Sequence, residues 1–125
     1  MNLNFNSILI GSENPKKLIA FYKKIFAKNP EWGEGGEWAG FGVGAGFVTI
    51  GPHTDVKGIN KESARIIFNF ETYRVEEEFE RIKKLGAEVV AEPYHPMEEE
   101  KMMIATFADP DGNYFQLMSP METSN

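Results

Sequence analysis

Apolar and polar positions alternate at the start of the chain and predict a β-strand from Leu3 to Ile10. In such a strand the odd-numbered residues, from Leu3 to Leu9, lie on one face and the even-numbered residues on the other. Both faces mix apolar and polar side chains. The alternation therefore predicts the strand but does not say which face meets the core.

A helical period follows this strand. Asn14 is in the position of an N-cap, and Pro15 is in the first helical position, where its missing N–H costs nothing. The helix is expected to end near Ala27, just before the Asn29-Pro30 pair. Apolar residues form its buried stripe: Leu18, Phe21, Tyr22, Ile25 and Phe26. Lysines form its solvent face, and the alternative interpretation of them is an anion-binding patch: Lys16, Lys17, Lys23, Lys24 and Lys28.

Between Glu31 and Gly51, glycines alternate with aromatic and β-branched residues. This pattern predicts short strands at Trp38–Val43 and Phe47–Ile50, with Glu31–Gly35 a weaker candidate. No Gly-Lys-Ser/Thr sequence and no helix follow the glycines, so they do not form a phosphate-binding loop. They indicate strong strand curvature or a ligand that lies close to the backbone.

The same order of elements then begins again after a polar segment, Pro52 to Ser63. A strand is expected at Ala64–Phe70, followed by a helix that Thr72 caps and Gly86 ends. Three further strands are expected after this helix: Ala87–Ala91, Met102–Phe107 and Tyr114–Met118. Strand, helix and three strands therefore occur twice, with little residue identity between the two copies.

Composition limits the class of protein. A chain of 125 residues with 42% hydrophobic residues can bury a core and fits one domain. Its net charge of −6 offers no basic surface for nucleic acid. No apolar run is long enough to span a bilayer and no secretory leader is present, so we expect a cytoplasmic protein without a membrane partner. The absence of cysteine excludes disulfides and thiolate catalysis.

Three motifs give the repeated order a family resemblance. They are I-A-F-Y in the first helix, L-G-A-E-V after the second, and F-A-D-P-D-G-N-Y-F-Q-L at residues 107–117. With these motifs the chain resembles the vicinal oxygen chelate superfamily, which includes glyoxalase I, extradiol dioxygenases, methylmalonyl-CoA epimerase, and fosfomycin- and bleomycin-resistance proteins. The resemblance covers essentially the whole chain. It identifies a fold better than an activity.

The resemblance implies an α+β fold in which two βαβββ modules form curved open-barrel sheets with a concave ligand face. We expect one glyoxalase-like domain over residues 1–125, with modules at 1–55 and 64–120. The linker is expected at 52–63, and a disordered tail at 121–125. The resemblance also implies a homodimer in which units of two chains complete each site.

The metalloenzymes of this superfamily hold a divalent ion with histidines or glutamine and a glutamate. The positions of this chain that match those ligands hold Ser7, Arg65 and Gln116. Because Arg65 is a permanent cation where a cation would bind, we expect no metal and no other cofactor. The alternative is a weak site at His53, or at His95 together with Glu98–Glu100.

Alternation along the strands suggests the residues of a different site. Arg65 and Asn69 share one strand face, and Tyr114 and Gln116 share another. Phe41 and Met103 are further candidates for apolar walls. The residues that we expect to bind a ligand are Ser7, Trp38, Phe47, Arg65, Asn69, Met102, Tyr114 and Gln116. The alternative is that Arg65 pairs with a surface glutamate and that the aromatic residues belong to the core.

Three functions are compatible with this set. The first is binding of a small organic molecule without a metal, as in proteins that confer resistance by sequestration. The second is a glyoxalase-like lyase or isomerase, or a dioxygenase, with atypical metal ligands. The third is a metal-free enzyme in which Arg65 stabilises an anion while Glu37, Tyr114 or His53 acts as acid or base. The sequence favours the first and leaves the presence of any enzymatic activity open.

Overall fold

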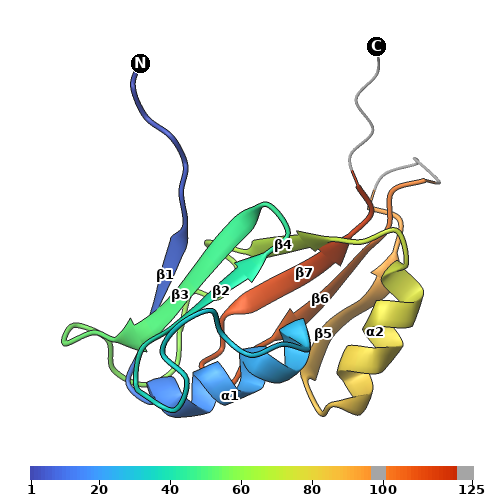
Figure 1. The fold of residues 1–125 in the computed structure, drawn as a ribbon. Coiled ribbons are helices and arrows are strands. Elements are labelled where there is room, and N and C mark those ends of the chain that lie inside the picture. The colour runs from blue at the N-terminus through green and yellow to red at the C-terminus, as the bar shows by residue number, and fades with distance from the viewer. Residues whose placement is uncertain (97–100, 121–125) are drawn as a thin grey trace. The chain divides into compact units, whose positions relative to one another are not determined.

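A computed structural model of the protein describes residues 1–96 and 101–120. The expected tail, residues 121–125, lies outside this part. The chain divides into two compact units, Met1–Gly58 (unit 1) and Ile59–Asn125 (unit 2), and Figure 1 shows a sheet and a helix in each. Within the described ranges, no helix has the length and hydropathy needed to cross a bilayer.

Unit 1 contains a three-stranded sheet and one helix. Its strands lie in the order β1-β3-β2, with β1 parallel and β2 antiparallel to the central β3. The elements are β1 (Ile8–Ser12), α1 (Pro15–Phe26), β2 (Ala39–Val43) and β3 (Gly46–Pro52). The expected strand at Glu31–Gly35 is reduced to a single antiparallel bridge between Trp32 and Gly40.

Helix α1 begins at Pro15 and ends before Ala27, which adopts the left-handed conformation with φ 54°. This confirms the predicted helix. Its cap differs from the prediction, because the Asn14 side chain makes no capping hydrogen bond. The buried Ser12 hydroxyl instead accepts the Asn14 N–H at 3.0 Å. Ser12 is the last residue of β1, so the end of this strand also fixes the start of the helix.

Aromatic side chains join α1 to the sheet of unit 1. The ring of Phe26 stacks on Tyr22 at 5.4 Å between centroids and meets Phe41 edge-on at 5.3 Å. Tyr22 and Phe41 are fully buried. Phe41 therefore belongs to the core on the helix side, which was the alternative to its role as a ligand wall.

Unit 2 contains the complete βαβββ order, with a four-stranded sheet in the order β4-β7-β6-β5. Strands β4 and β7 are parallel, and the pairs β7–β6 and β6–β5 are antiparallel. The elements are β4 (Phe68–Glu71), α2 (Val75–Lys84), β5 (Glu88–Tyr94), β6 (Ile104–Ala108) and β7 (Tyr114–Met118). The last strand has the predicted bounds.

Stacked phenylalanine rings form the core of unit 2. Phe79 of α2 contacts Phe107 of β6 at 5.2 Å, and Phe107 stacks on Phe115 of β7 at 5.5 Å between centroids. All three are at most 2% exposed. They place α2 on the face of the sheet that carries Phe107 and Phe115, so the neighbouring residues of β6 and β7 point to the other face.

Two strands begin later than predicted. Strand β1 begins at Ile8, and residues 1–7 are exposed and outside any strand. Strand β4 begins at Phe68, so Arg65 lies in the turn before it. Thr72 also has a different place, because α2 has Arg74 as its N-cap and the Thr72 hydroxyl accepts the Arg74 N–H at 3.0 Å.

The Asp-Pro-Asp-Gly-Asn turn joins β6 to β7. One Asp109 carboxylate oxygen accepts the backbone N–H groups of Asp111 and Asn113, each at 2.9 Å. The other carboxylate oxygen accepts the side-chain amide of Asn113 at 3.0 Å. Gly112 has φ 82°, which suits glycine, and donates its N–H to the Asp109 carbonyl. The turn thus holds the register in which Gln116 lies opposite Thr106.

Candidate functional site: the open faces of the two sheets

The sheet of each unit packs its helix on one face, and we call the opposite face the open face of that unit. In unit 1 the buried Ile50 and Phe41 lie on the helix side, so Phe47, Thr49 and Gly51 of β3 lie on the open face. The strand register aligns Thr49 with Leu9 of β1 and Gly40 of β2. It also aligns Gly51 with Gly11. The centre of this face is therefore made largely of glycine.

Trp38 covers one of these glycines. A Cβ atom at Gly51 would overlap the six-membered ring of Trp38, so the indole lies directly on the glycine backbone. The side chain nevertheless remains 44% exposed. One ring face of Trp38 thus packs on the sheet, and the residue keeps a large accessible apolar surface.

Trp32 covers a second glycine in the same way. It pairs with Gly40 through the isolated bridge, and a Cβ atom at Gly40 would overlap the Nε1 edge of its indole. Trp32 is 45% exposed. We call Trp32 and Trp38 the indole pair. The two indole rings that lie on Gly40 and Gly51 explain why these positions are glycine. This explanation differs from the two that the sequence suggested, strand curvature and an adjacent ligand.

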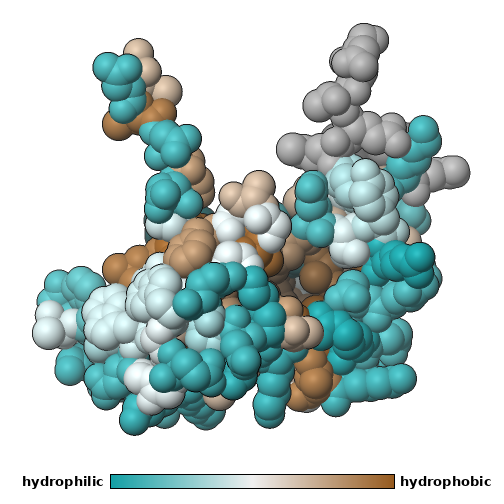
Figure 2. All heavy atoms as spheres, in the orientation of Figure 1, coloured by the Kyte–Doolittle hydropathy of each residue, from teal (hydrophilic) through white to brown (hydrophobic). Residues whose placement is uncertain are grey.

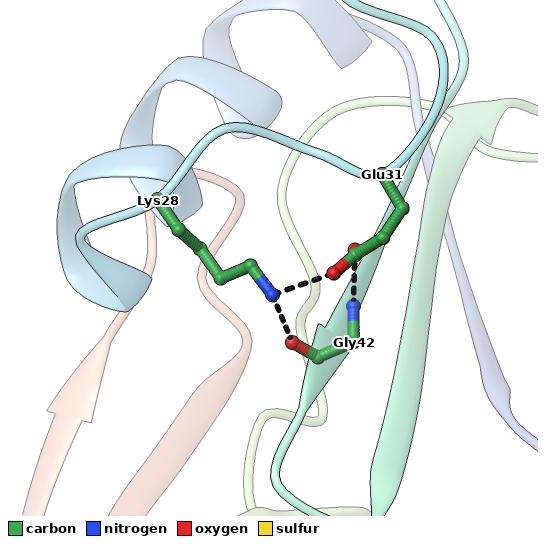
Figure 3. Close-up of polar contacts among 3 residues, drawn as sticks. All are labelled: Lys28, Glu31 and Gly42. Atoms are coloured by element: carbon green, nitrogen blue, oxygen red, sulfur yellow. Dashed lines mark hydrogen bonds and ion pairs between the residues drawn. The ribbon is translucent and has the colours of Figure 1, made fainter.

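A polar clamp holds the segment that carries Trp32 (Figure 3). The Lys28 ammonium donates to Glu31 Oε1 at 2.6 Å and to the Gly42 carbonyl at 2.8 Å. Gly42 N–H donates to Glu31 Oε2 at 2.5 Å. The hydrogen bond from Lys28, followed by that from Gly42, lowers the pKa of the Glu31 carboxyl below its usual value near 4.5. The clamp ties the residue before Trp32 to β2.

Polar and apolar side chains surround the indole pair. Leu9 is 53% exposed on β1, and the side chain of His53 lies 3.0 Å from the position of a Cβ at Gly11. The Nδ1 atom of His53 accepts the Asp55 N–H at 3.1 Å. With Nδ1 acting as an acceptor, a neutral ring carries its proton on Nε2. The open face of unit 1 thus offers two indoles, apolar side chains and one imidazole.

The open face of unit 2 is amide- and hydroxyl-rich. Asn69 of β4, Gln116 of β7 and Thr106 of β6 follow one another across the strands in register. The Gln116 amide donates to the Thr106 hydroxyl at 3.0 Å. This bond orients the Gln116 carbonyl oxygen as the acceptor that is left. Tyr114 and Met118 lie on the same face by alternation along β7.

Arg65 does not lie on this strand face. It lies in the turn before β4, its side chain is 73% exposed, and its guanidinium is 3.8 Å from the Glu62 carboxylate. This is the arrangement that the sequence offered as the alternative to a cationic centre. The alternation that placed Arg65 beside Asn69 fails because the chain is not yet a strand at residue 65.

The residues at the family's metal-ligand positions do not suit a divalent cation. Ser7 is exposed in unit 1, Arg65 is a cation paired with a glutamate, and Gln116 offers a single neutral amide oxygen while its NH2 group donates to Thr106. A divalent ion needs several anionic or neutral donors, and this set supplies no carboxylate and no imidazole. Among residues 1–96 and 101–120, no group of three or more His, Cys, Asp or Glu side chains is placed to hold a metal ion.

The other predicted residues have separate places. Met102 precedes β6, and its carbonyl oxygen is 2.8 Å from His95 Nδ1. Glu98–Glu100, the suggested partners of His95, lie outside the described residues. His95 and Arg74 line a hollow of about 330 Å³ at the N-terminal end of α2. Arg74 is paired there with Glu77 at 3.1 Å.

The sequence interpretation missed Trp32, Thr49 and Thr106. Trp32 had a signal, because the segment W-G-E-G-G-E-W places a tryptophan at each end of a glycine-rich stretch. Its role becomes visible only when Gly40 lies opposite it. Thr49 and Thr106 had no signal of their own, since strand register alone places them on the open faces.

Comparison with known proteins places this geometry in a family. The model of the glyoxalase-like domain matches residues 7–118. A search of curated protein sequences finds no match. Among solved structures, the fosfomycin resistance protein FosX from Listeria monocytogenes is 22% identical with a TM-score of 0.71, over 97% of this chain and 94% of that one. A variant of that FosX was crystallised with Mn(II) and 1S,2S-dihydroxypropylphosphonic acid.

Two further solved structures share the fold. TioX from Micromonospora sp. ML1 is 14% identical with a TM-score of 0.71, over 94% of this chain and 99% of that one. A glyoxalase-related enzyme from Fulvimarina pelagi is 14% identical with a TM-score of 0.75, over 94% of this chain and 88% of that one. At these identities the likeness concerns the fold, and it confirms the predicted α+β glyoxalase-like architecture. With a family model that matches nearly its whole length, the chain belongs to the glyoxalase-like family of the vicinal oxygen chelate superfamily.

Proposed function

We propose that the protein binds a flat organic small molecule against the open face of unit 1, without a divalent metal. The observation that carries this proposal is the indole pair. Each ring rests on a glycine and is nearly half exposed. Large exposed aromatic surfaces held in fixed positions are suited to stacking on planar ligands.

The rigidity of the indole pair supports binding rather than packing alone. The bridge to Gly40 and the Glu31 clamp fix the backbone at Trp32, and the indole packs on Gly40, so the side chain has less entropy to lose when a ligand stacks on it. A tryptophan kept only for the core would be buried more completely. The proposed ligand is therefore a planar aromatic compound that places a ring on Trp38, Trp32 or both.

Charge favours a neutral or cationic ligand. The chain carries a net charge of −6, which attracts cations over the protein as a whole. A cation over an indole face also gains directly from the ring quadrupole. One structural neighbour, FosX, is named as a fosfomycin resistance protein. For this chain we propose resistance by sequestration of a compound. We further propose that the protein works in the cytoplasm and as a homodimer.

The donor set supports the proposal that no metal takes part. Ser7 offers a hydroxyl, Arg65 a cation and Gln116 one amide oxygen, so the three positions supply no carboxylate and no imidazole. We therefore assign no step of the function to a bound metal ion.

A second candidate is a glyoxalase-like lyase or isomerase, or a dioxygenase, with atypical metal ligands. It is favoured by FosX, a neighbour of the same fold that was crystallised with Mn(II). This candidate requires a metal in the purified protein. A metal-free enzyme that uses Arg65 has less support, because Arg65 lies beside Glu62 in an exposed turn.

A thermal-shift screen separates these functions. The purified protein is heated with planar aromatic antibiotics and small carboxylates, in parallel samples with EDTA and with added Mn²⁺ or Zn²⁺. Because a ligand that binds only the folded state stabilises it by RT ln(1 + [L]/Kd), a 100-fold excess over Kd contributes about 2.7 kcal/mol. We expect at least one planar aromatic compound to raise the melting temperature by the same amount with and without EDTA. Hits that require the metal would favour the second candidate.

A further inference from the structure

The imidazole of His53 lies beside the indole of Trp38 on the open face of unit 1. His53 follows β3 directly, and its Cβ and Cγ atoms are 3.0 Å and 3.8 Å from the position that a Cβ would take at Gly11. The ring of Trp38 fills the corresponding position at Gly51. Gly11 and Gly51 are register partners in β1 and β3, and neighbouring strands lie about 4.8 Å apart. The two rings therefore cover adjacent glycines of one face.

A backbone hydrogen bond selects which nitrogen of His53 carries the proton. Nδ1 accepts the Asp55 N–H at 3.1 Å, so a neutral ring has its proton on Nε2. Within the part of the chain that the structure describes, Nε2 has no hydrogen-bond partner, and the His53 side chain is half exposed. Nε2–H is thus a donor that a ligand on this face can reach.

The segment that carries His53 is fixed to the rest of unit 1. The Val56 N–H donates to the His53 carbonyl at 3.1 Å, and a Val56 methyl group is 3.2 Å from the Cβ position at Gly11. The Gly58 N–H donates to Glu13 Oε1 at 3.1 Å. These contacts hold the imidazole in place before a ligand arrives, so less entropy is lost when it donates a hydrogen bond.

The indole pair by itself offers a limited apolar surface. Apart from residues 1–7, which project from unit 1 in Figure 2, the large hydrophobic side chains exposed among the described residues of unit 1 are Leu9, Trp32 and Trp38. Small-molecule sites combine such surfaces with a few polar groups that fix the orientation of the ligand. His53 has the place and the chemistry of a polar group of this kind.

We propose that Nε2–H of His53 donates a hydrogen bond to an acceptor oxygen at the edge of the ring system that stacks on Trp38. The ligand class is thereby narrowed to planar aromatic compounds with a ring carbonyl, such as quinones and acridones. A ring system without an acceptor would displace water from Nε2–H and leave the donor unpaired, which weakens binding. This inference rests on the proposed function, because it names the chemistry of the same site.

Thr49 is a second polar group on this face, and it differs from His53 in what it selects. It lies in register with Leu9 and Gly40, in the row of Trp32. A hydroxyl both donates and accepts, so it tolerates ligands of either kind, whereas Nε2–H of a neutral imidazole only donates. A preference for an acceptor therefore distinguishes the imidazole from the hydroxyl.

Nitrogen NMR of the imidazole rings tests the donor without any ligand. The chain has two histidines, so the His95→Gln variant assigns the remaining ring signals to His53. His95 is the internal control, because its Nδ1 is 2.8 Å from the Met102 carbonyl oxygen, which only accepts. At about pH 8.5, where an unperturbed histidine is neutral, we expect the proton on Nε2 in His53 and on Nδ1 in His95. A proton on Nδ1 of His53 overturns the inference and leaves the proposed function standing.

A matched pair of compounds tests whether a ligand uses the donor. The trimethylammoniomethyl derivatives of anthraquinone and anthracene have the same fused rings and the same cation, and the anthraquinone adds ring carbonyls. Both are titrated by calorimetry in the presence of EDTA, and the ratio of their Kd values is compared between variants, so that their different hydrophobicity cancels. His53→Phe keeps a flat ring without the donor, and it should lower the preference for anthraquinone by roughly 2- to 10-fold. Thr49→Val and His95→Phe should leave the ratio unchanged.

The outcomes separate this inference from the proposed function. A Kd ratio that is unchanged in His53→Phe, or that changes in Thr49→Val instead, overturns the role of the imidazole, although binding of both compounds would still support a site on the indole pair. Binding of neither compound by the parent protein also overturns the inference, and the proposed function then depends on the wider thermal-shift screen. Circular dichroism and the urea midpoint of His53→Phe show that the variant is folded.

Discussion

Substitution of Gly51 by alanine tests whether Trp38 rests on the sheet. The added Cβ would overlap three atoms of the six-membered ring, so the indole must move away from β3. Gly51 does not have a positive φ angle, and alanine therefore causes no backbone strain of its own. The effect of this substitution can be assigned to the displaced ring.

The expected change in the free energy of unfolding combines two terms. Overpacking against a side chain that must shift costs about 1–3 kcal/mol. Replacing glycine by alanine also restricts the unfolded chain, which stabilises the protein by about 0.5–1 kcal/mol. We therefore expect Gly51→Ala to destabilise the protein by up to roughly 2.5 kcal/mol, with a central value of about 1 kcal/mol.

Gly46→Ala is the matched control on the same strand. A Cβ at Gly46 meets only the Val43 carbonyl oxygen at 3.6 Å, an ordinary contact, and its φ angle is not positive. In Gly46→Ala, the added methyl group restricts the unfolded chain as it does in Gly51→Ala, but it does not overlap a neighbouring side chain. The two variants should differ by about 1–3 kcal/mol.

Urea denaturation followed by circular dichroism and by tryptophan fluorescence measures both effects. The chain has two tryptophans, both in the indole pair, so the emission reports on this site alone. Gly51→Ala should lower the urea midpoint and shift the emission of the folded protein to longer wavelength, because Trp38 becomes more hydrated. Equal midpoints and equal emission spectra for Gly51→Ala and Gly46→Ala would refute the described position of Trp38.

Three further substitutions test local parts of the structure by urea denaturation or thermal melting. Ser12→Ala should lower the free energy of unfolding by about 1 kcal/mol, because the Ser12 hydroxyl accepts the Asn14 N–H in the turn before α1. Asn14→Ala should lower it by less than about 0.5 kcal/mol, because the Asn14 side chain makes no capping hydrogen bond. A larger loss for Asn14→Ala than for Ser12→Ala would show that Asn14 is the cap. Asp109→Ala removes the carboxylate that accepts hydrogen bonds within the β6–β7 turn and should lower the free energy of unfolding by about 2 kcal/mol. Asp55→Ala, at an exposed position, should lower it by less than about 0.5 kcal/mol. Similar losses for the two variants would contradict this role of Asp109. Glu31 has a lowered pKa, so its favourable contacts are present above pH 4.5 and are lost as the pH falls through the pKa of the folded state. The Glu31→Gln variant should lose less stability on acidification than the parent protein, and identical pH profiles would argue against the clamp.

The sequence predicted correctly those helices and strands that a few neighbouring residues are enough to define. Helix α1 follows Pro15 and its apolar stripe, and β7 has the bounds that alternation gave. Alternation was a poorer guide to where strands begin. It continues through Leu3 and Arg65, yet a strand requires a neighbour, and β1 and β4 begin only where β3 and β7 lie beside them.

The positions of the site residues were harder to predict than the helices and strands, because these positions depend on how the strands pair. Trp38 was expected to bind a ligand from its residue type, but its position on Gly51 follows from the register of β2 and β3. Trp32 was missed because Gly40 is eight residues away in the sequence and becomes its neighbour only across the bridge. Arg65 was assigned to the site because the predicted strand began too early. Register and strand ends arise from contacts between distant segments, which a single sequence does not display.

The central claim is that a flat organic molecule binds on the indole pair and that no metal takes part. A titration of the best compound from the thermal-shift screen, followed by tryptophan fluorescence, tests it most directly when it is carried out with EDTA and again with excess Mn²⁺. The account predicts saturable quenching with the same Kd in both buffers, and a weaker Kd for the Trp38→Leu variant. Quenching that appears only with Mn²⁺, or a Kd unchanged by Trp38→Leu, would contradict it.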